Sequence, residues 1–157
     1  MIPGTEVNST VGHIAALFVT SHIPKGLSPI DAVKAIHDAG GLAMAVHPYH
    51  SDGIKDAVFD APFDIIETEC GSVFYREAVA RNSALTDDKR LAGIAKMGSS
   101  DAHYIRAIGN CYTVLDGVGN PTPESIRQAI EDGRCAPRCS MACQRARKLL
   151  GRLRRLG

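Results

Sequence analysis

The stretch LAMAVHP, from Leu42 to Pro48, decides the fold class of this 157-residue chain. Five consecutive apolar residues have the length of a strand that is buried on both faces, as in parallel sheets. A helix pattern precedes them: Ser28 can cap it, Pro29 suits its first position and Gly40 ends it. A helix that leads directly into a buried strand indicates an α/β protein.

The same alternation continues on both sides of this stretch. Apolar or extended runs predict further strands at residues 2–7, 13–19, 64–68, 93–97 and 111–115, of which 13–19 reads as buried on both faces. Helical patterns are found at residues 73–85, 87–92 and 121–133. Alternating strands and helices predict mostly parallel strands with crossover helices.

The charge of the chain changes near Gly133. Residues 1–133 hold 10 basic and 17 acidic residues, whereas residues 134–157 hold 8 basic residues and no acidic one. We therefore expect a domain at 1–133 and a basic tail at 134–157. The tail is either a solvated terminus or a contact element for nucleic acid, an acidic partner or a membrane surface.

The cysteines give a weaker signal. Cys135, Cys139 and Cys143 would share one face if the tail is helical, either as small apolar residues or with a metal or redox role. Five cysteines, an odd number, do not suggest a disulfide framework. There is also no apolar run long enough to span a membrane and no signal-peptide pattern. We therefore expect a reducing, cytoplasmic setting and no transmembrane segment.

Metal-binding residue types follow the predicted strands. His47 ends one strand, and Asp101 and His103 follow another through a Gly-Ser-Ser turn, with Glu67 or Glu69 on the strand between them. Carboxylate oxygens and imidazole nitrogens suit zinc, manganese or iron. Two such ions can bind a phosphate ester and activate a water. Taken singly, these residues also fit ordinary roles, such as a hydrogen-bonded loop histidine or a capping aspartate.

Four motifs, in this order, strengthen the metal interpretation: IPGTEV at 2–7, GHI at 12–14, AVHPY at 45–49 and GSSDAH at 98–103. Together they resemble the PHP ("polymerase and histidinol phosphatase") family over roughly residues 2–133. The resemblance implies a distorted (β/α)7 TIM-like barrel with mostly parallel strands, of which residues 1–133 would be the C-terminal part. It also implies divalent metal ions (Zn, Mn or Fe), up to three in the family and fewer here.

The resemblance assigns roles to individual residues. Glu6 corresponds to a carboxylate that bridges two metals, and His13 and His47 to the histidines that complete one of them. Asp101 corresponds to a ligand of the other bridged metal and His103 to a ligand of the third. The resemblance gives catalytic roles to Glu6, His47 and Asp101. It places Tyr49 and His50 beside the substrate.

One part of the family pattern is missing, because no His-x-His strand precedes Glu6. We therefore expect a partial barrel and a partial metal site. The predicted function is hydrolysis of a small phosphomonoester or nucleotide by a metal-activated water, weakened by the missing ligands. The alternative is a non-catalytic PHP remnant that serves as a binding or assembly module. Open sheet edges predict a homo-oligomer or pairing with a missing N-terminal segment.

Overall fold

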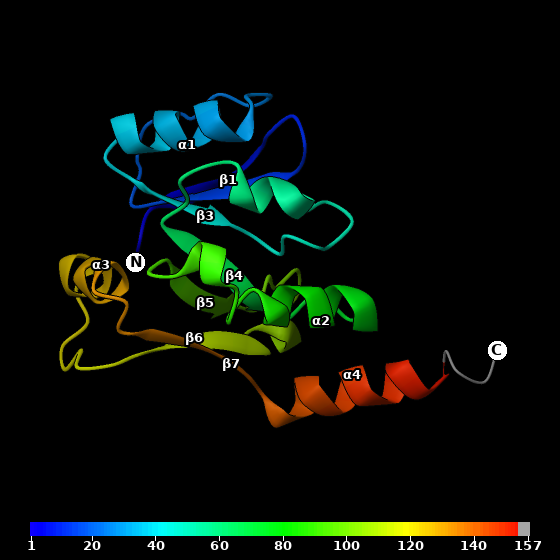
Figure 1. Cartoon of the computed structure of the whole chain (residues 1–157). Coiled ribbons are helices and arrows are strands. Elements are labelled where there is room, and N and C mark those ends of the chain that lie inside the picture. Colours follow the sequence, from blue (N-terminus) through cyan, green and yellow to red (C-terminus); the bar gives the residue numbers. More distant parts are fainter. Residues whose placement is uncertain (154–157) are drawn as a thin grey trace.

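A central sheet organises the computed structural model, which describes residues 1–153 and, for the last three of these, the backbone alone. Its strands are neighbours in chain order: β1 (Gly4–Asn8), β2 (His13–Leu17), β3 (Leu42–Ala45), β4 (Ile65–Cys70) and β5 (Ala95–Ser99) (Figure 1). Strand β2 is antiparallel to both of its neighbours, while β3, β4 and β5 are parallel. Four of these five strands therefore run in one direction. The mixed α/β class is confirmed, and the described strands form an open sheet rather than a closed barrel.

Four α-helices accompany the strands in the described part of the chain. They are α1 (Pro29–Asp38), α2 (Arg76–Ala84), α3 (Pro123–Glu131) and α4 (Met141–Leu153). Helix α1 begins where predicted, because the Ser28 hydroxyl accepts the Asp31 N–H at 3.2 Å. The helix predicted at 87–92 is wrong, since only a 3₁₀ turn forms there, at Lys89–Leu91. None of the helices in this part of the chain is both long and apolar enough to cross a membrane.

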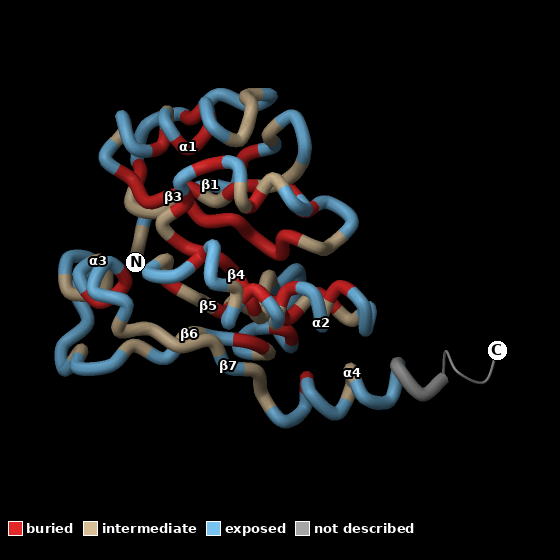
Figure 2. The backbone as a smooth tube through the Cα atoms, in the orientation of Figure 1, coloured by how far each residue is buried: buried red, intermediate tan, exposed pale blue. Residues whose placement is uncertain are grey.

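The core lies along the middle strands of the sheet. All four residues of β3 are buried, as the apolar stretch predicts, and Figure 2 shows the buried path continuing into β4. The side chains of Val33 and Ile36 on α1 pack into the same cluster as Ile14 and Ile66. The prediction that β2 is buried on both faces is wrong, because its burial alternates. As the antiparallel strand beside edge strand β1, it has only one fully covered face.

A separate two-stranded ribbon, β6 (Cys111–Leu115) with β7 (Cys135–Cys139), lies beside β5. The Thr113 hydroxyl donates to the Gly98 carbonyl at 2.8 Å and accepts the Gly98 N–H at 3.0 Å, so it connects the ribbon to β5. Cys111 lies opposite Cys139 and forms a disulfide with it.

The ribbon corrects two expectations. A disulfide is present although the cysteine count did not suggest one. Cys135 does not share a helix face with Cys139 and Cys143, because the first two lie at opposite ends of β7 and only Cys143 is on α4. Residues 135–139 thus form a strand of the folded body, although the charge pattern assigns them to the tail. The division into a domain at 1–133 and a tail at 134–157 stays a prediction. Arg154 and Arg155 of the tail lie outside the described residues.

Candidate metal centre

Three predicted metal ligands meet at one edge of the sheet. The end of β1, the start of β2 and the end of β3 coincide there because β2 is antiparallel to both neighbours. These positions carry Glu6, His13 and, just beyond β3, His47. One ligand atom from each lies within 4.8 Å of the other two. We call this group the histidine site.

Two ring nitrogens of the histidine site have no hydrogen-bond partner among the described residues. His13 Nδ1 lies 2.8 Å from Glu6 Oε1, without the geometry of a hydrogen bond. The rings of His13 and His47 are edge to face, with centroids 5.5 Å apart. His47 Nδ1 is buried and has no hydrogen-bond partner among the described residues. Because buried polar atoms normally have a partner, such an atom beside a carboxylate and a second imidazole fits a cation-binding position.

His47 is held in a strained backbone conformation. Its φ is +30°, a region that costs on the order of 1–3 kcal/mol for a residue other than glycine. The residue is only 3% exposed. Burial lowers the pKa of His47, and the charge of Asp101 opposes this shift. The imidazole is therefore neutral at neutral pH, which is the form that binds a metal.

Glu67 on β4 holds the backbone of His47. It is almost completely buried, its Oε2 accepts the His47 backbone N–H at 2.6 Å, and its Oε1 accepts the Ser99 hydroxyl. Burial raises the pKa of Glu67 to about 7. The sequence alone does not tell whether Glu67 or Glu69 supports the site. Glu67 directly follows two apolar residues within the strand, and this position could have identified it as the buried carboxylate.

Asp101 and His103 do not join the three ligands. Asp101 lies close enough for its charge to act on His47, its φ is also positive, at +44°, and it accepts the Ser72 hydroxyl at 2.5 Å. The His103 side chain is 79% exposed, and its Nδ1 lies 3.0 Å from the Asp101 carbonyl oxygen. The structure thus leaves one predicted ligand beside the site and the other in solvent.

The two residues predicted to lie beside the substrate differ in their surroundings. The His50 ring lies 5.3 Å from the ring of His47, so His50 borders the site. The Tyr49 hydroxyl instead donates to Asp56 at 2.7 Å, and the Arg81 guanidinium stacks on the Tyr49 ring at 3.8 Å. Tyr49 is therefore already engaged by its own neighbours.

Comparisons with known proteins agree with the fold. A family model described as PHP-associated matches residues 89–135. A region of similar fold is found in a two-domain protein of Bacteroides vulgatus that contains a predicted PHP-like metal-dependent phosphoesterase. The two structures match with a TM-score of 0.62 at 18% sequence identity, and the match covers 88% of this chain and 44% of the Bacteroides chain. The resemblance to the PHP family is thereby confirmed. The PHP-associated match includes Asp101 and His103 but begins after the histidine site.

Two uncharacterized proteins of Methanocaldococcus jannaschii are also similar to this chain. One is 37% identical over 87 residues, which is 54% of this chain and 50% of the relative. The other is 24% identical over 134 residues, 80% of this chain and 55% of the relative. The chain thus spans about half the length of these curated relatives.

Proposed function

We propose that this chain is a metal-dependent phosphoesterase of the PHP type that acts on a small phosphomonoester or nucleotide. The observation that carries the proposal is the histidine site, where three neighbouring strands bring Glu6, His13 and His47 together around an unpartnered buried nitrogen. Two imidazoles and one carboxylate are a donor set that suits Zn²⁺, Mn²⁺ or Fe²⁺. The fold likeness to a PHP-like protein supports the same chemistry.

The residues around the proposed ion have distinct tasks. A bound divalent cation would polarise the phosphoester and lower the pKa of a water molecule. Glu67 fixes the backbone of His47, and burial keeps this imidazole neutral. His50 lies at the border of the site, where its ring can donate a hydrogen bond to a phosphate oxygen. We propose Asp101, beside His47, as a further metal ligand. We propose that His103 becomes a ligand only when the substrate or a second ion is bound.

We also propose that the open sheet is part of a larger, distorted barrel, since the relatives are about twice as long as their matched regions. Pairing of the sheet edges with a further segment or a second copy stays a prediction. The same holds for a cytoplasmic location and for contact of the basic tail with nucleic acid or an acidic partner.

The test combines metal content with turnover. The purified chain is incubated with Mn²⁺ or Zn²⁺, its bound metal is measured by mass spectrometry, and hydrolysis of p-nitrophenyl phosphate is followed by absorbance. His47→Ala should lose about 100-fold or more in metal affinity and turnover, because a ligand matters at least as much as the groups that orient ligands. The matched control is His22→Ala, since His22 is exposed and should leave both values unchanged.

A non-catalytic PHP remnant is the second candidate, and the exposure of His103 favours it. A remnant would be folded, would bind no metal and would show no turnover with either ion. Equal turnover in wild type and His47→Ala would contradict the enzyme proposal, because the activity would then come from another source.

A further inference from the structure

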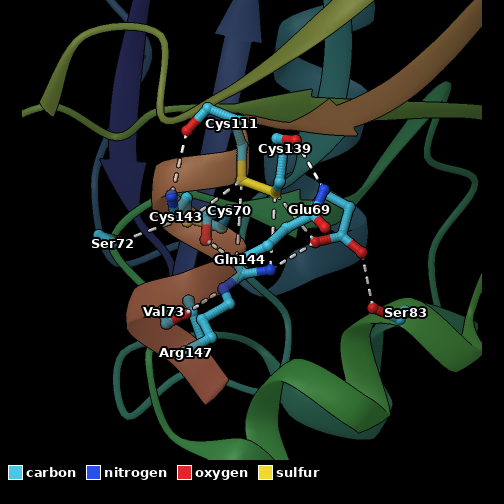
Figure 3. A network of polar contacts seen from close by, with 11 residues as sticks. Glu69, Cys70, Ser72, Val73, Ser83, Cys111, Cys139, Cys143, Gln144 and Arg147 are labelled. Atoms are coloured by element: carbon cyan, nitrogen blue, oxygen red, sulfur yellow. Dashed lines mark hydrogen bonds and ion pairs between the residues drawn. A yellow bond between two sulfur atoms is a disulfide. The ribbon is translucent and has the colours of Figure 1, made fainter. Parts of the chain in front are cut away.

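A second group of metal-binding side chains lies where the β6–β7 ribbon meets α4 (Figure 3). Cys111 begins β6, Cys139 ends β7, and Cys143 is in the first turn of α4. The Sγ atoms of Cys111 and Cys143 are 4.0 Å apart, and all three sulfurs lie within 4.8 Å of one another. Cys111 and Cys143 are 1% and 3% exposed, and Cys139 is half-buried, so two of the three sulfurs are shielded from solvent, as the ligands of structural metal sites are.

A fourth donor reaches this group from β4. Glu69 Oε2 lies 3.2 Å from Cys139 Sγ, and the Ser83 hydroxyl donates to the other oxygen of Glu69 at 2.8 Å (Figure 3). A tetrahedral zinc ion with bonds of about 2.3 Å to sulfur places two sulfur ligands about 3.8 Å apart. The distance between Cys111 and Cys143 is close to this value.

Arg147 places a positive charge beside this group. Three thiolates and one carboxylate around a divalent cation leave two excess negative charges. The Nη1 atom of Arg147 is 2.7 Å from Glu69 Oε2 and 3.5 Å from Cys139 Sγ, and its Nη2 is 3.8 Å from Cys111 Sγ. Hydrogen bonds to the ligands themselves are characteristic of metal sites in proteins.

We propose that Cys111, Cys139, Cys143 and Glu69 bind a thiophilic divalent cation such as Zn²⁺ when the disulfide is reduced. We call this the thiol site, and it shares no ligand with the histidine site. The Cys111–Cys139 disulfide first takes two electrons and two protons from a dithiol, which itself becomes a disulfide. Binding of the cation then releases the three thiol protons. The oxidised chain holds the disulfide, and the reduced chain holds the metal.

Cobalt titration tests the thiol site without any activity measurement. The full chain is reduced with a phosphine, exchanged into anaerobic buffer and titrated with Co²⁺. Thiolate ligands give a charge-transfer band in the near ultraviolet, whereas the nitrogen and oxygen donors of the histidine site do not. We expect this band to saturate at one cobalt ion per chain, to disappear on addition of Zn²⁺ and to be absent from the oxidised chain.

Matched variants separate the thiol site from other cysteines and from the proposed catalytic centre. Cys143→Ser should lower the cobalt affinity at least tenfold, whereas Cys135→Ser, at the far end of β7, should not change it. His47→Ala should keep the full band, so failure of the proposed function leaves this result intact. Oxidised Cys143→Ser retains the Cys111–Cys139 pair, and its circular dichroism shows whether it folds.

Three outcomes would overturn the thiol site. One is a reduced, folded wild type that gives no charge-transfer band. Another is an unchanged band in Cys143→Ser. The third is a loss of helical circular dichroism on reduction that Zn²⁺ does not reverse.

Discussion

The substitution Glu67→Gln should remove a large part of the pH dependence of stability. Burial raises the pKa of Glu67 to about 7 in the folded chain from an ordinary value of 4.5. Between these values the unfolded chain is ionised and the folded chain is protonated, so stability is lost as the pH rises from 4.5 to 7. Each pH unit in this window costs about 1.4 kcal/mol, and the whole window therefore costs about 3 kcal/mol.

Glutamine keeps the shape of the side chain and cannot ionise. Its carbonyl can accept the His47 N–H, and its amide can donate to the Ser99 hydroxyl. Urea unfolding with a chelator present, followed by circular dichroism, should give similar stabilities for wild type and variant at about pH 4.5, and a variant more stable by about 3 kcal/mol at about pH 8. The control, Glu77→Gln, changes an exposed carboxyl on α2 and should follow wild type. Parallel pH profiles for wild type and Glu67→Gln would refute the reasoning.

Two further substitutions test how the two sites are held. Gly53→Ala should destabilise the chain by about 1–3 kcal/mol in a urea titration, because the added Cβ would lie 2.2 Å from the His47 carbonyl oxygen. The control Gly119→Ala has open space around the added Cβ and should leave the stability unchanged. Arg147→Ala should lower the free energy of unfolding by about 2–3 kcal/mol, because its charged hydrogen bonds are lost. It should also speed proteolysis of α4, whereas the control Arg145→Ala changes an exposed side chain and should not. Equal cleavage rates in the two variants would contradict this prediction.

The parts of the fold that depend on neighbouring residues could be predicted from the sequence. The cap at Ser28, the helix that follows it and the buried strand β3 all formed as expected. The burial of β2 could not be predicted in the same way. It depends on which strand lies beside it, and an apolar run alone does not distinguish a central parallel strand from an antiparallel one next to an edge.

The two sites show the same limit. The resemblance to the PHP family implied that Glu6, His13 and His47 share one metal, and the structure brings them together. A sheet of parallel strands alone would not predict this, because His13 begins its strand and reaches this edge only through the antiparallel direction of β2. The thiol site could not be predicted from the sequence, because Cys139 meets Cys111 across 28 residues and Glu69 across 70. The four-residue cysteine spacing instead suggested a helix face with Cys135, Cys139 and Cys143. In the structure the pairing of β6 with β7 brings Cys111 to Cys139 and leaves Cys135 at the other end of β7.

Strand β4 explains how one short segment can serve both sites. Side chains two apart on a regular strand point to the same face, so Glu67 and Glu69 would be expected to share their surroundings. The pairing of β4 with β5 shifts register between these two residues, and such a bulge re-aims a side chain. Glu67 consequently contacts His47, whereas Glu69 contacts Arg147 and Cys139. One strand thus contacts the histidine site through Glu67 and the thiol site through Glu69.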